Sequence, residues 1–140
     1  MAGELDAGLI AEYEAIFTYG DAGPHLSDAQ AETARTAEER HRDMRDAVLT
    51  WLHHAEHEPP AMQPVYELPI DPVDADSAAE AIHQAEQRCV RAWRSVLAAT
   101  DGESRDLAVR AMSESAVSLG RWRRVLGQTP SVDAFPGRSA

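Results

Sequence analysis

The sequence has 140 residues, enough for one domain with a sizeable core, and its formal net charge is −11. This charge disfavours binding to nucleic-acid phosphates and to anionic lipid surfaces. One cysteine excludes an internal disulfide, and no run approaches the roughly 18 apolar residues of a membrane-spanning helix. The acidic N-terminus lacks the apolar stretch of a signal peptide. We therefore expect a cytoplasmic protein with neither a nucleic-acid nor a membrane partner.

The first predicted helix covers residues 4–21. Its apolar positions are spaced alternately four and three residues apart, as in one face of a helix packed in a bundle. An acidic residue, Glu12, stands at the centre of this face, where a bundle normally places an apolar side chain. Gly20, Gly23 and Pro24 predict the end of the helix.

The second predicted helix covers residues 28–55, after a capping box formed by Ser27 and Gln30. One bundle-facing spacing, 34-38-41-45-48-52, places Glu38, His41 and Arg45 towards the core. A competing and more apolar spacing, 37-41-44-48-51, turns Glu38 towards solvent. His41 belongs to both faces, so either choice predicts a histidine in the core.

Residues 57–76 contain five of the eight prolines and cannot form a regular element. An extended chain of this length reaches roughly 60 Å, enough to run from one end of such a bundle to the other. This makes the second and third helices parallel, joined by one long crossover as in ferritin-like bundles. Apolar residues such as Tyr66 favour a strap docked on the bundle over the alternative of a disordered linker.

The third and fourth helices are predicted at 77–99 and 103–126, with capping boxes at Ser77–Glu80 and Thr100–Glu103. The short link between these helices makes them antiparallel neighbours. Glu86 interrupts the apolar face of the third helix, whereas Glu114 lies beside that of the fourth. The tail, residues 127–140, offers Phe135 for packing on the bundle. We predict a single all-α domain over residues 1–140.

The predicted polar core consists of Glu12, Glu38, His41, Arg45 and Glu86, with Glu114 as a weaker member. Carboxylate-bridged di-metal sites in bundles take one Glu from each of two helices and Glu-x-x-His from each of the other two. Here only the second helix supplies Glu-x-x-His. Three interpretations stay open: a metal-free network in which Arg45 neutralises Glu12 or Glu86, one bound ion, or a di-metal site of iron or manganese.

Two further groups of residues are weaker candidates for metal binding or catalysis. His53 and His57 are four residues apart and can chelate a surface metal, or they simply complement a helix C-terminus. Cys89 occupies an apolar position and is expected to be an inert core thiol. We identify no nucleophile and no phosphate-binding loop, and so no catalytic residue.

Several motifs spread along the chain are familiar in combination: 11–20 (AEYEAIFTYG), 41–47 (HRDMRDA), 59–60 (PP), 65–69 (VYELP), 121–123 (RWR) and 134–137 (AFPG). With these motifs the sequence resembles a small actinobacterial ferritin-like domain family of unknown function. The resemblance covers nearly the whole chain and implies a ferritin-like four-helix bundle that is commonly dimeric, with Glu12, His41 and Arg45 as its shared polar core. Family members often have histidine where this chain has Tyr13, which argues against metal.

These observations favour a non-catalytic structural or partner-binding bundle with a degenerate metal site, no cofactor, and a homodimeric or protein partner. The alternative is a metal-dependent oxidoreductase or iron-handling protein with a reduced carboxylate and histidine site. A third hypothesis is a small-molecule pocket beside the polar cluster, where alanines and Ser115 leave space.

Overall fold

The computed structural model describes residues 2–128, and these contain helices and no strand. This confirms the predicted all-α fold. Short 3-10 turns occupy Ala2–Leu5, Gly23–His25 and Leu97–Ala99. The predicted packing of Phe135 lies outside the described residues. The four long helices are α1 (Asp6–Ala22), α2 (Asp28–His54), α3 (Ala75–Val96) and α4 (Gly102–Val125).

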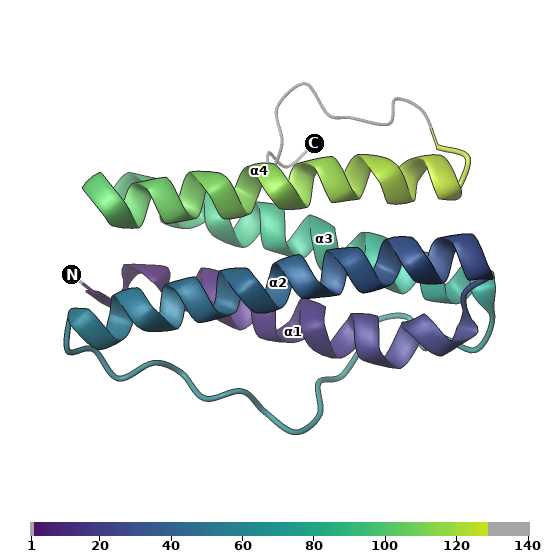
Figure 1. Cartoon of the computed structure of the whole chain (residues 1–140), viewed down its shortest axis with the longest axis horizontal. Helices are drawn as coiled ribbons and strands as arrows, with labels where there is room; N and C mark the ends of the chain where they lie inside the picture. Colours follow the sequence, from purple (N-terminus) through teal and green to yellow (C-terminus); the bar gives the residue numbers. More distant parts are fainter. Residues whose placement is uncertain (1, 129–140) are drawn as a thin grey trace.

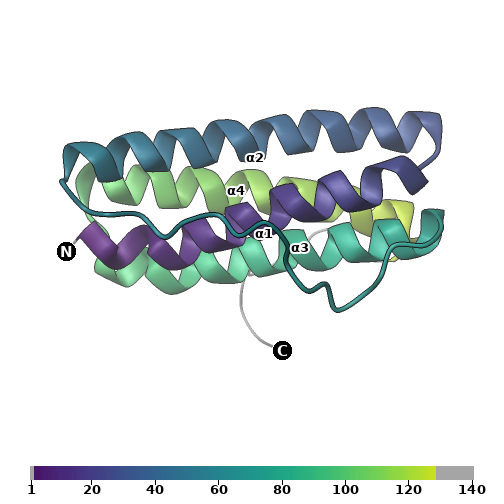
Figure 2. The ribbon, with the colours of Figure 1, turned by 90° about the horizontal axis from the view of Figure 1, so that it is seen from below.

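The four helices lie side by side as one bundle (Figures 1 and 2). The helices α2 and α3 run in the same direction, while α1 and α4 run the opposite way (Figure 1). The connection between α2 and α3, residues 55–74, crosses from one end of the bundle to the other along α1 (Figure 2). The parallel arrangement that the proline-rich segment predicted is therefore present.

This long connection, which we call the strap, docks on α1. The Tyr13 hydroxyl donates a hydrogen bond to the Pro60 carbonyl at 2.9 Å. The rings of Phe17 and Tyr66 meet edge to face, with centroids 5.8 Å apart. These contacts match the expected ordered strap rather than the disordered linker.

The predicted capping boxes are each misplaced or incomplete. Ser27 is the N-cap of α2, but its side chain makes no capping hydrogen bond. The helix α3 begins earlier than predicted, because Asp74 accepts the Ser77 amide at 2.9 Å and forms the box with Ser77. At α4 the Asp101 amide donates to the Ser104 hydroxyl at 3.2 Å. An aspartate at these positions also places its negative charge against the positive end of the helix dipole.

The core has two apolar clusters, separated along α2 by His41. The larger cluster includes Leu9, Val48 and Trp93, and the smaller includes Tyr19, Ile82 and Trp122. Along α2, the buried residues of the smaller cluster end at Ala37, and those of the larger begin at Met44. The core of the bundle therefore has a polar layer at the level of His41, with one apolar cluster on each side of it.

Candidate functional site

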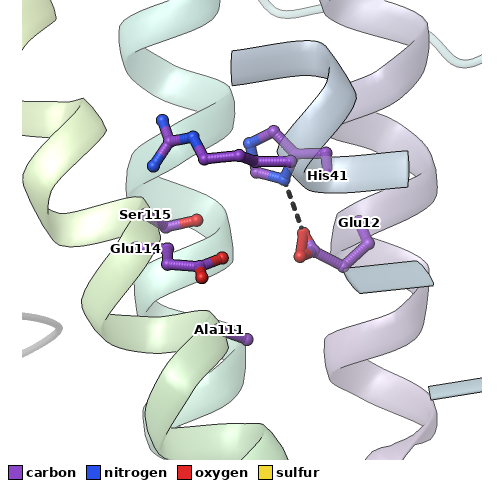
Figure 3. Close-up of a pocket in the computed structure, with 6 residues that line it drawn as sticks. Glu12, His41, Ala111, Glu114 and Ser115 are labelled. Carbon is purple, nitrogen blue, oxygen red and sulfur yellow. Dashed lines mark hydrogen bonds and ion pairs between the residues drawn. The ribbon is translucent and has the colours of Figure 1, made fainter. Parts of the chain in front are cut away.

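His41 links two glutamates from different helices at the centre of the bundle. Its Nδ1 lies 2.8 Å from Oε2 of Glu12 on α1, and its Nε2 lies 2.8 Å from Oε1 of Glu86 on α3. The side chains of Glu12, His41 and Glu86 are 2%, 6% and 0% exposed, so solvent barely weakens these contacts. We call these three residues the histidine staple; Figure 3 shows its contact between His41 and Glu12.

The two carboxylates decide the charge of His41. Burial by itself disfavours the imidazolium, but Glu86 and Glu12 together raise the pKa of His41 well above its usual value. Burial likewise works against the Glu86 carboxylate, yet the His41 charge lowers the pKa of Glu86 below its usual value. His41 is therefore a cation that donates one hydrogen bond to each glutamate.

The hydrogen-bond network continues from Glu86 to α4. The Tyr19 hydroxyl donates to Oε2 of Glu86 at 2.6 Å and accepts from Nε1 of Trp122 at 3.1 Å. Burial and the nearby Glu86 charge raise the pKa of Tyr19 well above its usual value, so it remains a neutral phenol. Tyr19 and Trp122 are not among the polar-core residues predicted from the sequence. Their polar atoms on otherwise apolar faces were the available signal.

Cys89 completes the surroundings of Glu12. Its thiol lies 3.4 Å from the Ala11 carbonyl and 3.5 Å from Oε2 of Glu12, with the sulfur as donor. Burial, reinforced by the Glu12 and Glu86 charges, raises the pKa of Cys89 well above its usual value. Such a thiol is a poor nucleophile, in keeping with the predicted inert core residue.

The predicted core positions of Glu38 and Arg45 are wrong. Glu38 is partly exposed and pairs with Arg42 at 3.2 Å, and Arg45 pairs with Asp46 at 3.0 Å near the surface. The competing spacing matches the inward face of α2 better, because a permanent cation is costly to bury when an apolar face is available. The buried residues of α2 are Ala34, Ala37, His41, Met44, Val48 and Leu52.

A small cavity lies beside the staple. Its lining comes from three helices: Glu12 on α1, Arg40 and His41 on α2, and Ala111, Glu114 and Ser115 on α4. In Figure 3 the side chains of Glu12 and Glu114 approach this space from opposite sides. The cavity measures about 10 Å³, which is room for one water molecule. The predicted small-molecule pocket beside Ser115 is therefore too small for an organic ligand.

These residues do not fit a two-metal carboxylate centre. Such a centre needs a histidine from a second helix, and the cavity face of α4 offers only Ala111, Ser115 and a half-buried Glu114. Both nitrogens of His41 already serve carboxylates. One group of three metal-ligating atoms within 4.8 Å of each other does exist among the described residues, namely Glu12, His41 and Cys89. Binding there requires His41 and Cys89 to lose protons that their surroundings stabilise.

His53 and His57, the pair predicted to chelate a surface metal, each contact another side chain. His57 Nε2 lies 3.0 Å from Asp6, and the ring of His53 packs on that of His54 at 6.0 Å. Within residues 2–128, no group of three metal-ligating side chains forms at this end of α2.

Comparisons with known proteins identify the family. No curated protein matches the chain. The crystal structure of rv2844, a conserved hypothetical protein from Mycobacterium tuberculosis, is similar, with a TM-score of 0.85 and 31% sequence identity over 96% of this chain and 95% of that one. Within residues 2–128, no helix is long and apolar enough to cross a membrane. Because the model of the domain of unknown function DUF4439 matches residues 4–140, a span that includes all four helices, the strap and the staple, the chain belongs to this family.

Proposed function

We propose that this protein is a non-catalytic, ferritin-like bundle that serves as a structural or partner-binding module. The observation that carries this proposal is His41, which binds a glutamate with each ring nitrogen. A protonated histidine thereby supplies the positive charge that metal ions supply to carboxylates in di-metal bundles. The staple connects three helices at the level where such a centre would lie.

The surroundings of the staple also favour a structural role. The cavity beside it admits nothing larger than one water molecule. The nearby thiol and phenol are held in their protonated forms. A site for chemistry on a substrate needs space and an activated group, and this layer has neither.

The partner-binding part rests on the outer surface of α4. Val109, Val117 and Val125 are 40%, 54% and 40% exposed, so α4 presents three apolar side chains that a partner can cover. A homodimer or a protein partner in the cytoplasm remains our proposal for the outer surface of this helix. Analytical sedimentation of the wild type and of a Val117→Glu variant measures the oligomeric state. A monomeric wild type would contradict the proposed homodimer.

Metal analysis tests the metal-free staple. The protein is purified without a histidine tag from cells grown with added iron and manganese. We expect far less than one metal ion per chain. Stoichiometric metal that disappears in Glu12→Ala but persists in Glu38→Ala would overturn the proposal, because Glu38 lies outside the staple.

A metal-dependent oxidoreductase or iron-handling protein is the alternative. The proximity of Glu12, His41 and Cys89 favours it, since a thiolate, an imidazole and a carboxylate together suit a single transition-metal ion. Oxygen consumption with added ferrous ion distinguishes the two functions. We expect the same rate with the protein as without it, and a rate that depends on Glu12 would support the alternative.

A further inference from the structure

Glu12 lies at the cavity, and its hydrogen bonds from other described residues end on one of its two carboxylate oxygens. The hydrogen bonds that described residues donate to this carboxylate come from His41 and Cys89, and both end at Oε2. Oε1 remains, on a residue that is 1% exposed and that lines the cavity. A carboxylate oxygen that borders a cavity can accept a hydrogen bond from a water molecule held there.

A buried donor without an acceptor lines the same cavity. Nε of Arg40 is inaccessible to solvent and makes no hydrogen bond with another described residue. Leaving such a donor unsatisfied is unfavourable. Glu12 and Arg40 thus line one cavity of about 10 Å³ together with the buried Ser115, and the Nε of Arg40 makes no hydrogen bond with a described residue.

We propose that this cavity is a binding site for a single ordered water molecule, and that Arg40 closes it to metal cations. A water molecule can donate to Oε1 of Glu12 and accept from Nε of Arg40, with the Ser115 hydroxyl as a third partner. Its size matches the cavity, and three polar partners are typical of a buried water. The Arg40 guanidinium places a positive charge at this cavity, beside the carboxylates of Glu12 and Glu114 that also line it.

A metal ion does not meet the same requirements. It cannot accept a hydrogen bond from Nε of Arg40, and it would lie next to a guanidinium that is always charged. Arg40, rather than the Arg45 that the sequence suggested, is thus the arginine that keeps cations from Glu12. This inference rests on the proposed metal-free staple and specifies what occupies the space beside it.

A high-resolution crystal structure, from crystals grown with manganese present, tests the water site directly. We expect a density peak at about 2.7–3.2 Å from both Oε1 of Glu12 and Nε of Arg40. No peak in the cavity would overturn the inference, as would a peak at about 2.0–2.2 Å from Glu12, which is a metal distance. A metal held by His41 and Cys89 beside an intact water peak would refute the proposed function alone.

The claim that Arg40 closes the cavity to metal cations is tested by titration with Mn²⁺, with binding monitored by electron paramagnetic resonance. Arg40→Met removes the charge that lines the cavity, and Arg42→Met removes one that pairs with Glu38 outside it. We expect at least about tenfold tighter Mn²⁺ binding in Arg40→Met only. Should Arg40→Met fail to fold, Arg40→Gln removes the charge while keeping a donor. Wild-type affinity in a folded Arg40 variant would overturn the role of Arg40.

Discussion

His41 sets the electrostatic balance of the buried layer, because each of its ring nitrogens faces a different carboxylate. Such an arrangement is not automatically stabilising, since three ionised groups lose their hydration when the bundle folds. Once they are buried, however, removing one member leaves the others without compensation. The staple therefore specifies how α1, α2 and α3 align more than it adds to overall stability.

Replacing His41 with alanine should destabilise the protein strongly. The change leaves Glu12 and Glu86 buried without their counterion, and breaking a buried ion pair in this way costs about 3–5 kcal/mol. Urea unfolding at neutral pH measures the loss. His53→Ala, at an exposed position of the same helix, should change the free energy of unfolding by no more than about 0.5 kcal/mol. Equal losses in the two variants would contradict a special role for the staple.

The staple also predicts how stability depends on pH. The folded-state pKa of His41 is raised above 6.5, so its contribution is complete below pH 6.5 and is lost as pH rises through the raised value. The folded-state pKa of Glu86 is lowered below 4.5, so its contribution is present above pH 4.5 and is lost as pH falls through the lowered value. We expect maximal stability between these limits.

Urea unfolding of the wild type across the pH range measures this profile. In Glu86→Gln the loss of stability on the alkaline side should be smaller, because the amide cannot raise the pKa of His41. The same alkaline slope in the wild type and in Glu86→Gln would show that His41 is not coupled to Glu86.

The contact between α1 and α3 depends on a glycine in the first turns of α1. An added Cβ at Gly8 would lie 2.5 Å from the Trp93 ring, closer than real side chains approach one another. Trp93 is fully buried, so a shift of its ring has to displace the residues packed around it. The glycine therefore lets α1 approach α3 closely, and this approach helps to bring Glu12 and Glu86 to opposite sides of His41.

Gly8→Ala should weaken the bundle although alanine is the better helix former. Overpacking of this kind costs about 1–3 kcal/mol, which exceeds the gain in helix propensity. The matched control is Gly23→Ala, where nothing lies within 4 Å of the added Cβ and the backbone φ is −49°. We expect the control to be neutral or more stable by about 0.4–1 kcal/mol. Thermal unfolding followed by circular dichroism compares them, and equal stability would contradict tight packing at Gly8.

The whole molecule is strongly acidic, with a net charge of −11 spread over a small bundle. Self-repulsion of this kind opposes the compact state. The staple, by contrast, is enclosed and is little affected by dissolved salt. Surface repulsion and buried attraction should therefore respond differently to ionic strength.

Raising NaCl should stabilise the protein. Going from about 0.01 M to about 1 M shortens the screening length from about 30 Å to about 3 Å, which removes most of the repulsion between surface carboxylates. The midpoint of thermal unfolding should rise. Chloride is preferred to sulfate, because sulfate also strengthens apolar burial. A midpoint that falls with NaCl would mean that attractive surface pairs outweigh the net repulsion.

Much of this architecture is readable from local patterns. Apolar spacing locates the four helices, and the prolines of the strap require a long crossover, which makes α2 and α3 parallel. Glu12, Glu86 and His41 stand out because each interrupts an apolar face. The helix starts are predicted less accurately, since Asp74 and Asp101 compete as caps with the nearby Ser77 and Thr100. Local sequence does not say which of two polar residues close together in the chain caps the helix.

The sequence by itself determined the helices, their directions and the presence of ionisable groups in the core, because these follow from period and chain length. Only the tertiary structure decided which groups meet. The two candidate faces of α2 differ by a small rotation, and burying Met44 rather than Arg45 selected the rotation that carries His41 between two glutamates. That rotation also turned Arg40 to the cavity. Such a choice depends on the summed packing of all helices, which no single stretch of sequence contains.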